Sequence, residues 1–165
     1  INKVKDLKNV VSLKIEGRMK SENYIATITN MYRSALDNNT NNYVNLDNLS
    51  GGRELFSGNI NNLFNEDSQI FEIKKTSPNQ SYLGVVEYLI KDRVFVRVKN
   101  FFTKDNEFYL FAPKYSSLKF MIKDLRNIEG EPIEKANHPE DIVSFYADNK
   151  DIKFSKGAFI KKWQS

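Results

Sequence analysis

The sequence predicts an α+β protein that is mainly β, in which a small C-terminal β-barrel follows one βα unit left from a truncated α/β barrel domain. After Tyr82, about seven short apolar segments recur at roughly ten-residue spacing, which is typical of a small closed β domain. Near the N-terminus, one stretch has the three- and four-residue apolar spacing of a helix. Aromatic residues make up 13% of the chain, which favours packed sheets.

The pattern of residues 1–40 predicts the last strand and helix of the truncated α/β barrel domain. Val10–Ile15 is short and β-branched, which indicates a buried strand, and Gly17 allows a sharp turn after it. Ser21 can cap a helix over Glu22–Asp37, whose apolar residues form one wide stripe. A buried parallel strand needs neighbours on both sides, so we expect the rest of that domain to be missing from this chain.

Residues 41–81 predict a connecting segment, because they are rich in Asn and show little periodicity. A short helix is possible near Asp47, and Gln69–Lys74 alternates weakly, as an edge strand does.

Residues 82–165 predict the β-barrel domain. Lys91–Asp92 separates two alternating runs and is expected at the tip of a hairpin. Asn127–Ile133 contains Gly130 and Pro132 and indicates a turn. That turn lies between Asp124–Leu125 and Ile133–Glu134. The other expected strands are Leu83–Ile90, Arg93–Lys99, Glu107–Phe111, Leu118–Ile122, Ile142–Tyr146 and Ala158–Lys161.

Composition excludes several kinds of site. With 0 Cys, the chain supplies no disulfide, no thiol nucleophile and no ligand for an iron–sulfur cluster, and with 1 His it predicts no metal site. His138 precedes Pro139, and this pattern indicates a loop residue rather than a catalyst. No apolar run is long enough to span a bilayer, and we expect no membrane partner and a cytoplasmic location.

Two groups of residues are candidates for binding. Glu16 and Arg18 would lie at the C-terminal end of the first strand, where ligands bind in α/β folds; alternatively they form a structural ion pair. Lys156, Lys161 and Lys162, with Trp163, are candidates for contact with RNA or another anion, although the net charge of +4 equally suits solvated surface lysines. No catalytic residue is assigned.

Aromatic residues of the β region leave two uses open. Phe101–Phe102 and Tyr109–Phe111 can stack on bases, as in RNA-binding barrels, or fill the core of the barrel.

The stretch Leu13–Ser21, with the helix residues that follow it, resembles a segment of peptidase family U32. The resemblance continues in order along nearly the whole chain, although Glu54 and Leu55 depart from the family's usual Gly and Phe between Arg53 and Gly58. The downstream segments that carry it are Tyr82–Val86, Val96–Phe102, Ala112–Pro113, Gly130–Ile133, Ala136–Pro139 and Lys156–Lys161.

This resemblance implies the C-terminal portion of a collagenase-like peptidase, a hydrolase whose β domain serves substrate docking or stabilisation. The alternative is the RNA-binding module of a U32-family enzyme that hydroxylates tRNA or ribosomal RNA bases; other branches are linked to quinones. The expected partners are the missing N-terminal part of the parent protein and a peptide or RNA substrate. An iron–sulfur cluster in the parent would need cysteines upstream of this chain, and the chain alone is expected to be inactive.

Overall fold

The computed structural model describes residues 9, 11–18, 20–37, 82–112 and 115–162, and it divides the chain into two compact units, Ile1–Asn79 and Gln80–Ser165. The helix expected near Asp47, the edge strand expected over Gln69–Lys74, and Trp163 lie outside the described residues.

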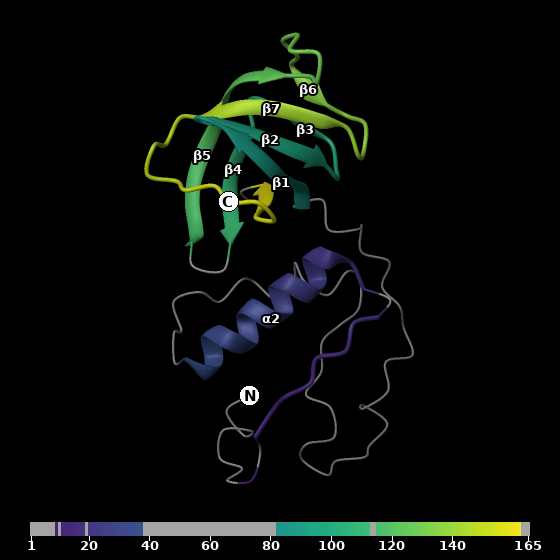
Figure 1. The fold of residues 1–165 in the computed structure, drawn as a ribbon, viewed down its shortest axis with the longest axis vertical. Coiled ribbons are helices and arrows are strands. Elements are labelled where there is room, and N and C mark those ends of the chain that lie inside the picture. The colour runs from purple at the N-terminus through teal and green to yellow at the C-terminus, as the bar shows by residue number, and fades with distance from the viewer. Residues whose placement is uncertain (1–8, 10, 19, 38–81, 113–114, 163–165) are drawn as a thin grey trace. The chain divides into compact units, whose positions relative to one another are not determined.

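The first unit contains helix α2 (Glu22–Leu36) (Figure 1). Ser21 caps its N-terminus, since its hydroxyl oxygen accepts a hydrogen bond from the Tyr24 N–H at 3.3 Å. At the other end, the Asp37 N–H bonds to the Arg33 carbonyl at 3.0 Å, and the Arg33 Nε donates to the Asp37 carboxylate at 2.8 Å. The predicted helix and its cap are therefore confirmed, and the helix ends one residue earlier than expected.

The strand expected over Val10–Ile15 does not form in its described residues, 11–15, and this prediction was wrong. Residues 11–17 form no strand, and Val11, Leu13 and Ile15 are exposed. A β-strand is held by hydrogen bonds to its neighbours, and an apolar β-branched sequence does not form one without them. The turn is nevertheless present, because the Lys20 N–H bonds to the Gly17 carbonyl at 2.9 Å.

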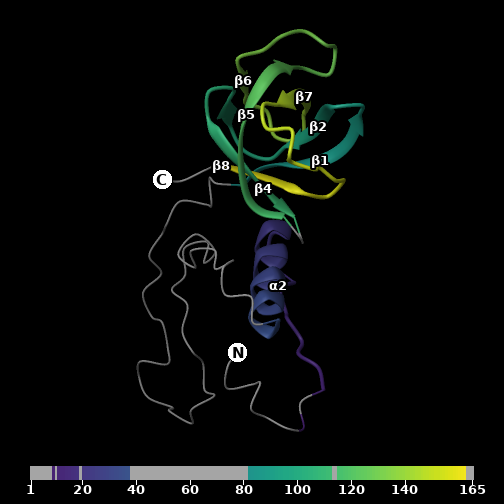
Figure 2. The same ribbon diagram turned by 90° about the vertical axis from the view of Figure 1, so that its left-hand side faces the viewer.

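The second unit is a closed antiparallel barrel in which β2 lies between β1 and β7, and β8 joins β4 to β1 (Figures 1 and 2). The strand order is β1-β2-β7-β5-β4-β8. The predicted barrel is confirmed. Its strands are β1 (Tyr82–Ile90), β2 (Arg93–Val98), β4 (Glu107–Ala112), β5 (Tyr115–Arg126), β7 (Ile142–Ala147) and β8 (Phe159–Lys162). The short pair β3 (Phe102–Thr103) and β6 (Lys135–Ala136) forms a separate two-stranded sheet that the pattern did not predict.

Alternation along the strands builds the core of the barrel. Val94, Val96 and Val98 point inward and are almost completely buried, while their neighbours in β2 are partly exposed. Three phenylalanine rings fill the interior, with centroids 5.5 Å apart between Phe108 and Phe120 and 6.1 Å apart between Phe120 and Phe145.

Three local features shape the ends of the strands. Ile90 pairs with Arg93, so Lys91–Asp92 is the two-residue loop of the predicted hairpin, and Lys91 has a φ of 53°. Asp124 has the same φ of 53°, at an irregularity in the pairing of β5 with β7. The predicted turn over 127–133 is confirmed, with Gly130 in the left-handed region at a φ of 88°.

Candidate nucleic-acid interface

A cleft of about 540 Å³ lies at the β1–β2 hairpin tip of the barrel. The tip residue Lys91 and the loop after β7 line its sides, and Tyr146 and Leu89 supply exposed apolar surface. We call it the lysine cleft, after Lys91, Lys150 and Lys153. Its acidic member is Asp92, so the side chains that line it carry more positive than negative charge.

The loop after β7 holds Lys150 and Lys153 outward. The Asn149 amide donates to the Lys119 carbonyl at 3.2 Å, and its oxygen accepts from the Asp151 N–H at 3.0 Å. Ile152 is buried, and Phe154 packs edge-on against Phe120 with ring centroids 5.3 Å apart. Because these apolar side chains anchor the loop in the core, the two lysines between and beside them remain exposed.

The three lysines of the cleft differ from several others on the barrel. Lys99, Lys104 and Lys119 pair with Glu140, Glu134 and Glu107 at 2.9, 2.7 and 3.6 Å. Within the described ranges, by contrast, no ion pair joins Lys91, Lys150 or Lys153 to a carboxylate. Unpaired lysines beside an aromatic surface are the combination that binds a phosphate backbone together with its bases.

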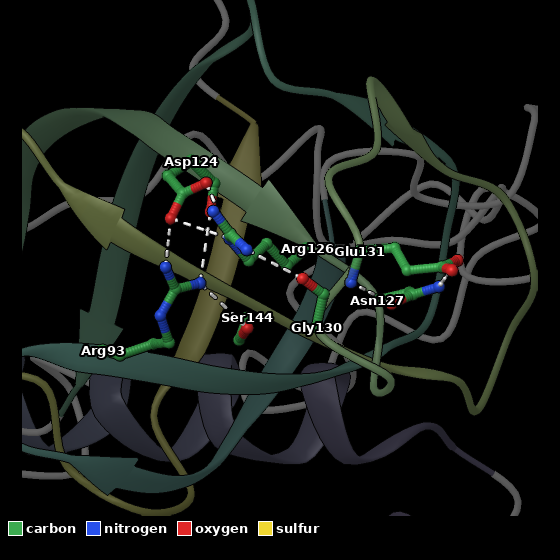
Figure 3. Close-up of polar contacts among 7 residues, drawn as sticks. All are labelled: Arg93, Asp124, Arg126, Asn127, Gly130, Glu131 and Ser144. Carbon is green, nitrogen blue, oxygen red and sulfur yellow. Dashed lines mark hydrogen bonds and ion pairs between the residues drawn. The ribbon is translucent and has the colours of Figure 1, made fainter.

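An arginine packs against one face of the Tyr146 ring. The Arg93 guanidinium carbon lies 4.3 Å from the centroid of the Tyr146 ring. Arg93 also donates to the Ser144 hydroxyl at 3.1 Å and forms an ion pair with the Asp124 carboxylate (Figure 3). Arg126 reaches the same carboxylate from the other side, with its Nε 2.8 Å from Oδ1 (Figure 3). The ring therefore rests on a rigid network of hydrogen bonds.

The electrostatics of this network centre on Asp124. Burial tends to raise the pKa of its carboxyl group, but hydrogen bonds from Arg126 and Arg93 outweigh burial and bring the pKa below its ordinary value. Asp124 therefore stays ionised and keeps both arginines in place, and its left-handed backbone aims the carboxylate between them.

A second cleft, of about 280 Å³, lies at the other end of β2. We call it the Phe101 cleft. It is lined by Asn100, Phe101, Thr103, Asn106 and Lys162. It brings together two of the residues singled out in the sequence, because Phe101 is 60% exposed and Lys162 is exposed at the end of β8.

The three lysines expected to form one anion-binding patch are separated in the structure. Lys156 is exposed and acts electrostatically on Glu87, whose pKa is lowered mainly by its hydrogen bond from Arg97. Lys161 is 2% exposed and lies 4.3 Å from the centre of the Phe111 ring, so its ammonium group does not reach the surface. Lys162 lines the Phe101 cleft. Consecutive strand residues face opposite directions, which places Lys161 and Lys162 on different sides of β8.

Glu16 and Arg18 do not lie at a strand end, because the strand before them is absent. Both are exposed. The Glu16 carboxylate forms its ion pair with the Lys14 Nζ at 2.8 Å, and the alternative expectation of a pair with Arg18 was wrong for the described part of the chain. The two side chains of this Lys14–Glu16 pair are 80% and 63% exposed, so the pair contributes little to stability.

The aromatic residues singled out in the sequence divide between filling the core and lying at the surface, where a ring can stack on a base. Phe102 and Phe111 are buried, Tyr109 is mostly buried and burial raises its pKa to about 12, and Phe101 remains at the surface. His138 is exposed in a loop, as predicted.

Sequence reasoning missed the lysine cleft, since its members lie about 60 residues apart and only the pairing of β2 with β7 brings them together.

The fold defines a protein with a small closed antiparallel β-barrel domain that follows a helical unit. The family model described as the peptidase family U32 C-terminal domain matches residues 78–160, and the model described as peptidase family U32 matches residues 1–77. The chain therefore belongs to peptidase family U32. Among the described residues, no helix is long and apolar enough to cross a membrane.

Curated and solved relatives were also found. The chain is 29% identical to the tRNA hydroxylation protein P1 of Bacillus subtilis, over 84% of this chain and 36% of that protein, so it spans about a third of the relative's length. A crystal structure of the C-terminal domain of a Geobacillus thermoleovorans protein named as a U32 peptidase is 19% identical and covers 54% of this chain and 99% of that domain, with a TM-score of 0.47. Its selenomethionine variant is 20% identical over 49% and 98% of the two chains, with a TM-score of 0.44.

Proposed function

We propose that this chain is the C-terminal part of a U32-family enzyme that hydroxylates tRNA, and that its barrel holds the tRNA while chemistry occurs elsewhere in the enzyme. The observation that carries the proposal is the lysine cleft, which is lined by three lysines without ion-pair partners in the described ranges and by the exposed ring of Tyr146. The similarity to a tRNA hydroxylation protein supports the same substrate class.

The physical basis is the release of counterions. Each lysine that contacts a phosphate displaces a condensed cation, so affinity falls as salt rises, with a slope set by the number of contacts. Three contacts give a slope of about two to three on a double-logarithmic plot. If the net charge of +4 were spread evenly over the surface, RNA would have no electrostatic reason to bind at these three lysines rather than elsewhere.

The test compares two triple variants that remove the same charge. K91Q/K150Q/K153Q neutralises the cleft, and K104Q/K119Q/K123Q neutralises three lysines elsewhere on the barrel; each lowers the net charge from +4 to +1. Binding of an unmodified tRNA transcript is measured by fluorescence anisotropy at several salt concentrations. We expect the cleft variant to lose most of the salt dependence and the control to keep it. Equal losses in both variants, or no tRNA binding by the unaltered chain, would refute the proposal.

The second candidate is peptide docking for a peptidase, which the family description favours. Extended peptides often bind by adding a strand to a free sheet edge. All six strands of the closed barrel are paired on both sides, so among the described residues such an edge is offered by the two-residue strands β3 and β6 and not by the barrel. Competition distinguishes the two candidates: gelatin that displaces labelled tRNA from the chain would favour the peptidase role, and gelatin that leaves the anisotropy unchanged would favour the RNA role.

A further inference from the structure

Phe101 is the most exposed aromatic side chain among the described residues, at 60% of its surface. The next residue, Phe102, is 1% exposed and packs edge-on against Phe108 with ring centroids 5.6 Å apart. On the other side, the backbone N–H groups of Lys99 and Asn100 both donate to the Leu83 carbonyl, at 2.8 and 3.2 Å. Phe101 is thus fixed between two anchored neighbours, and its ring cannot turn into the core without breaking those contacts.

Two asparagines of the Phe101 cleft have fixed amide groups. The Asn100 Nδ2 donates to the Tyr82 carbonyl at 2.6 Å, and the Asn106 Oδ1 accepts from the Thr103 N–H at 3.1 Å. These bonds determine which end of each amide is engaged. Asn100 keeps its Oδ1 as an acceptor, and Asn106 keeps its Nδ2 as a donor. One acceptor and one donor complement the edge of a nucleobase, which carries both kinds of group.

Lys162 supplies the charge at this cleft. It is exposed at the last position of β8 and lines the cleft together with Phe101. An ammonium beside an exposed ring matches a nucleotide, in which a phosphate lies next to a flat base. Burial keeps the neighbouring Lys161 away from the surface, so Lys162 is the cation that β8 presents here.

We propose that the Phe101 cleft is a subsite for one unpaired nucleotide, in which the base stacks on Phe101, its edge meets Asn100 and Asn106, and a phosphate contacts Lys162. This inference rests on the proposed function, because it takes RNA as the ligand, and it adds that the barrel recognises a single-stranded segment. A paired base is stacked within its helix and offers no free face, so a duplex cannot occupy this subsite.

The experiment uses the full chain and two probes, a 12-nucleotide oligoadenylate and the same strand in a duplex with its complement. Phe101→Ala removes the ring and Phe101→Trp preserves a stacking surface. Met121→Ala removes another exposed apolar side chain, on β5, as a control. We expect Phe101→Ala to weaken single-strand binding about tenfold and duplex binding less than about twofold. Phe101→Trp and Met121→Ala should bind both probes as the unaltered chain does.

A spectroscopic readout separates stacking from general damage. In the Phe101→Trp variant, oligoadenylate should quench indole fluorescence beyond the quenching seen with the unaltered chain, whose Trp163 provides the background. Asn106→Asp keeps the acceptor for the Thr103 N–H but removes the Nδ2 donor, and should lower single-strand affinity more than duplex affinity at unchanged thermal stability.

The outcomes distinguish this inference from the proposed function. Binding that depends on the lysine cleft but changes equally for both probes in Phe101→Ala would overturn the subsite and leave the proposed function standing. If the unaltered chain bound no RNA, both the Phe101 subsite and the proposed function would be refuted. Fluorescence of the Phe101→Trp variant that responds to gelatin and not to oligoadenylate would overturn the subsite in favour of a peptide.

Discussion

The Arg93 guanidinium lies 4.3 Å from the centroid of the Tyr146 ring, and the same group bonds to Ser144 and pairs with Asp124. One side of the ring is therefore occupied by a cation that other contacts hold in place, while 40% of the residue remains exposed to solvent. A ring backed in this way is a preorganised stacking surface, since little side-chain entropy remains to be lost when a base binds.

Tyr146→Ala is expected to weaken tRNA binding about tenfold, the loss of one stacked base, while Tyr146→Phe keeps the ring and most of the affinity. Equilibrium anisotropy with tRNA gives both values. Thermal unfolding of the two variants serves as the control, because a large fall in Tm for Tyr146→Ala would mean that the ring supports the barrel rather than the ligand. Equal affinities for both variants would show that Tyr146 does not contact RNA.

Acid should destabilise the barrel partly through Asp124. Its folded-state pKa lies below the ordinary value of 3.8, so the folded chain binds this proton less readily than the unfolded chain. The stabilisation is fully present well above pH 3.8 and is lost progressively as the pH falls from that value through the folded-state pKa. Urea unfolding from pH 6 to pH 2.5 should show a shallower decline for Asp124→Asn than for the unaltered chain. Parallel curves would mean that Asp124 is equally acidic in both states.

Lys161 is expected to cost stability at neutral pH. Burial lowers its pKa from the ordinary 10.5 to about 8, so below pH 8 the folded chain keeps a charge that water would solvate better. As the pH rises from 8 to 10.5, the folded chain loses this proton before the unfolded chain, and stability increases. Lys161→Met should therefore be more stable at pH 7 by on the order of 2 kcal/mol, with a smaller difference at pH 10. An equal difference at both pH values would contradict the assignment.

Lys91→Gly should separate stability from binding. A lysine at a φ of 53° is strained, and glycine relieves this at the hairpin tip, so we expect a gain of about 0.5–1 kcal/mol in urea unfolding. The same change removes one cation of the lysine cleft and should lower the salt slope of tRNA binding by about one. Asp92→Gly is the matched control, since its φ is not positive and it gains nothing from glycine. A stability loss in Lys91→Gly would refute the strain argument.

Under the proposed function this chain is the C-terminal part of a longer enzyme, and Arg18 is tested in that enzyme. If the sequence-based expectation of a ligand site holds, Arg18→Ala lowers turnover strongly at unchanged Tm, and Arg18→Lys fails to restore it when the contact is bidentate. We expect no turnover by the present chain alone in peptide hydrolysis or RNA hydroxylation assays. A fully active Arg18→Ala parent would remove Arg18 from the site, and turnover by this chain would show that it holds a complete site.

Local patterns predicted much of the fold. The Ser21 cap, the Lys91–Asp92 hairpin and the inward valines of β2 follow from short-range spacing, and each is present. The prediction of a strand before Gly17 was wrong, because a strand forms only with hydrogen-bonded neighbours, which a local sequence pattern does not contain. The candidate site was predicted only in part: Phe101 and Lys162 line the same cleft, whereas Lys161 is buried. The lysine cleft needs long-range strand order, which spacing does not provide.

The strand β2, which lies between β1 and β7, also sets the distance between the lysine cleft and the Phe101 cleft. The lysine cleft lies at the Arg93 end of β2 and the Phe101 cleft lies beyond Val98, and the six-residue strand between these ends is roughly 17 Å long at the usual rise per residue. Because β2 is hydrogen-bonded on both sides, by β1 and β7, the length of this strand sets how far apart the two clefts lie. A ligand long enough to reach both ends gains avidity through effective concentration, while a shorter ligand occupies one end at a time.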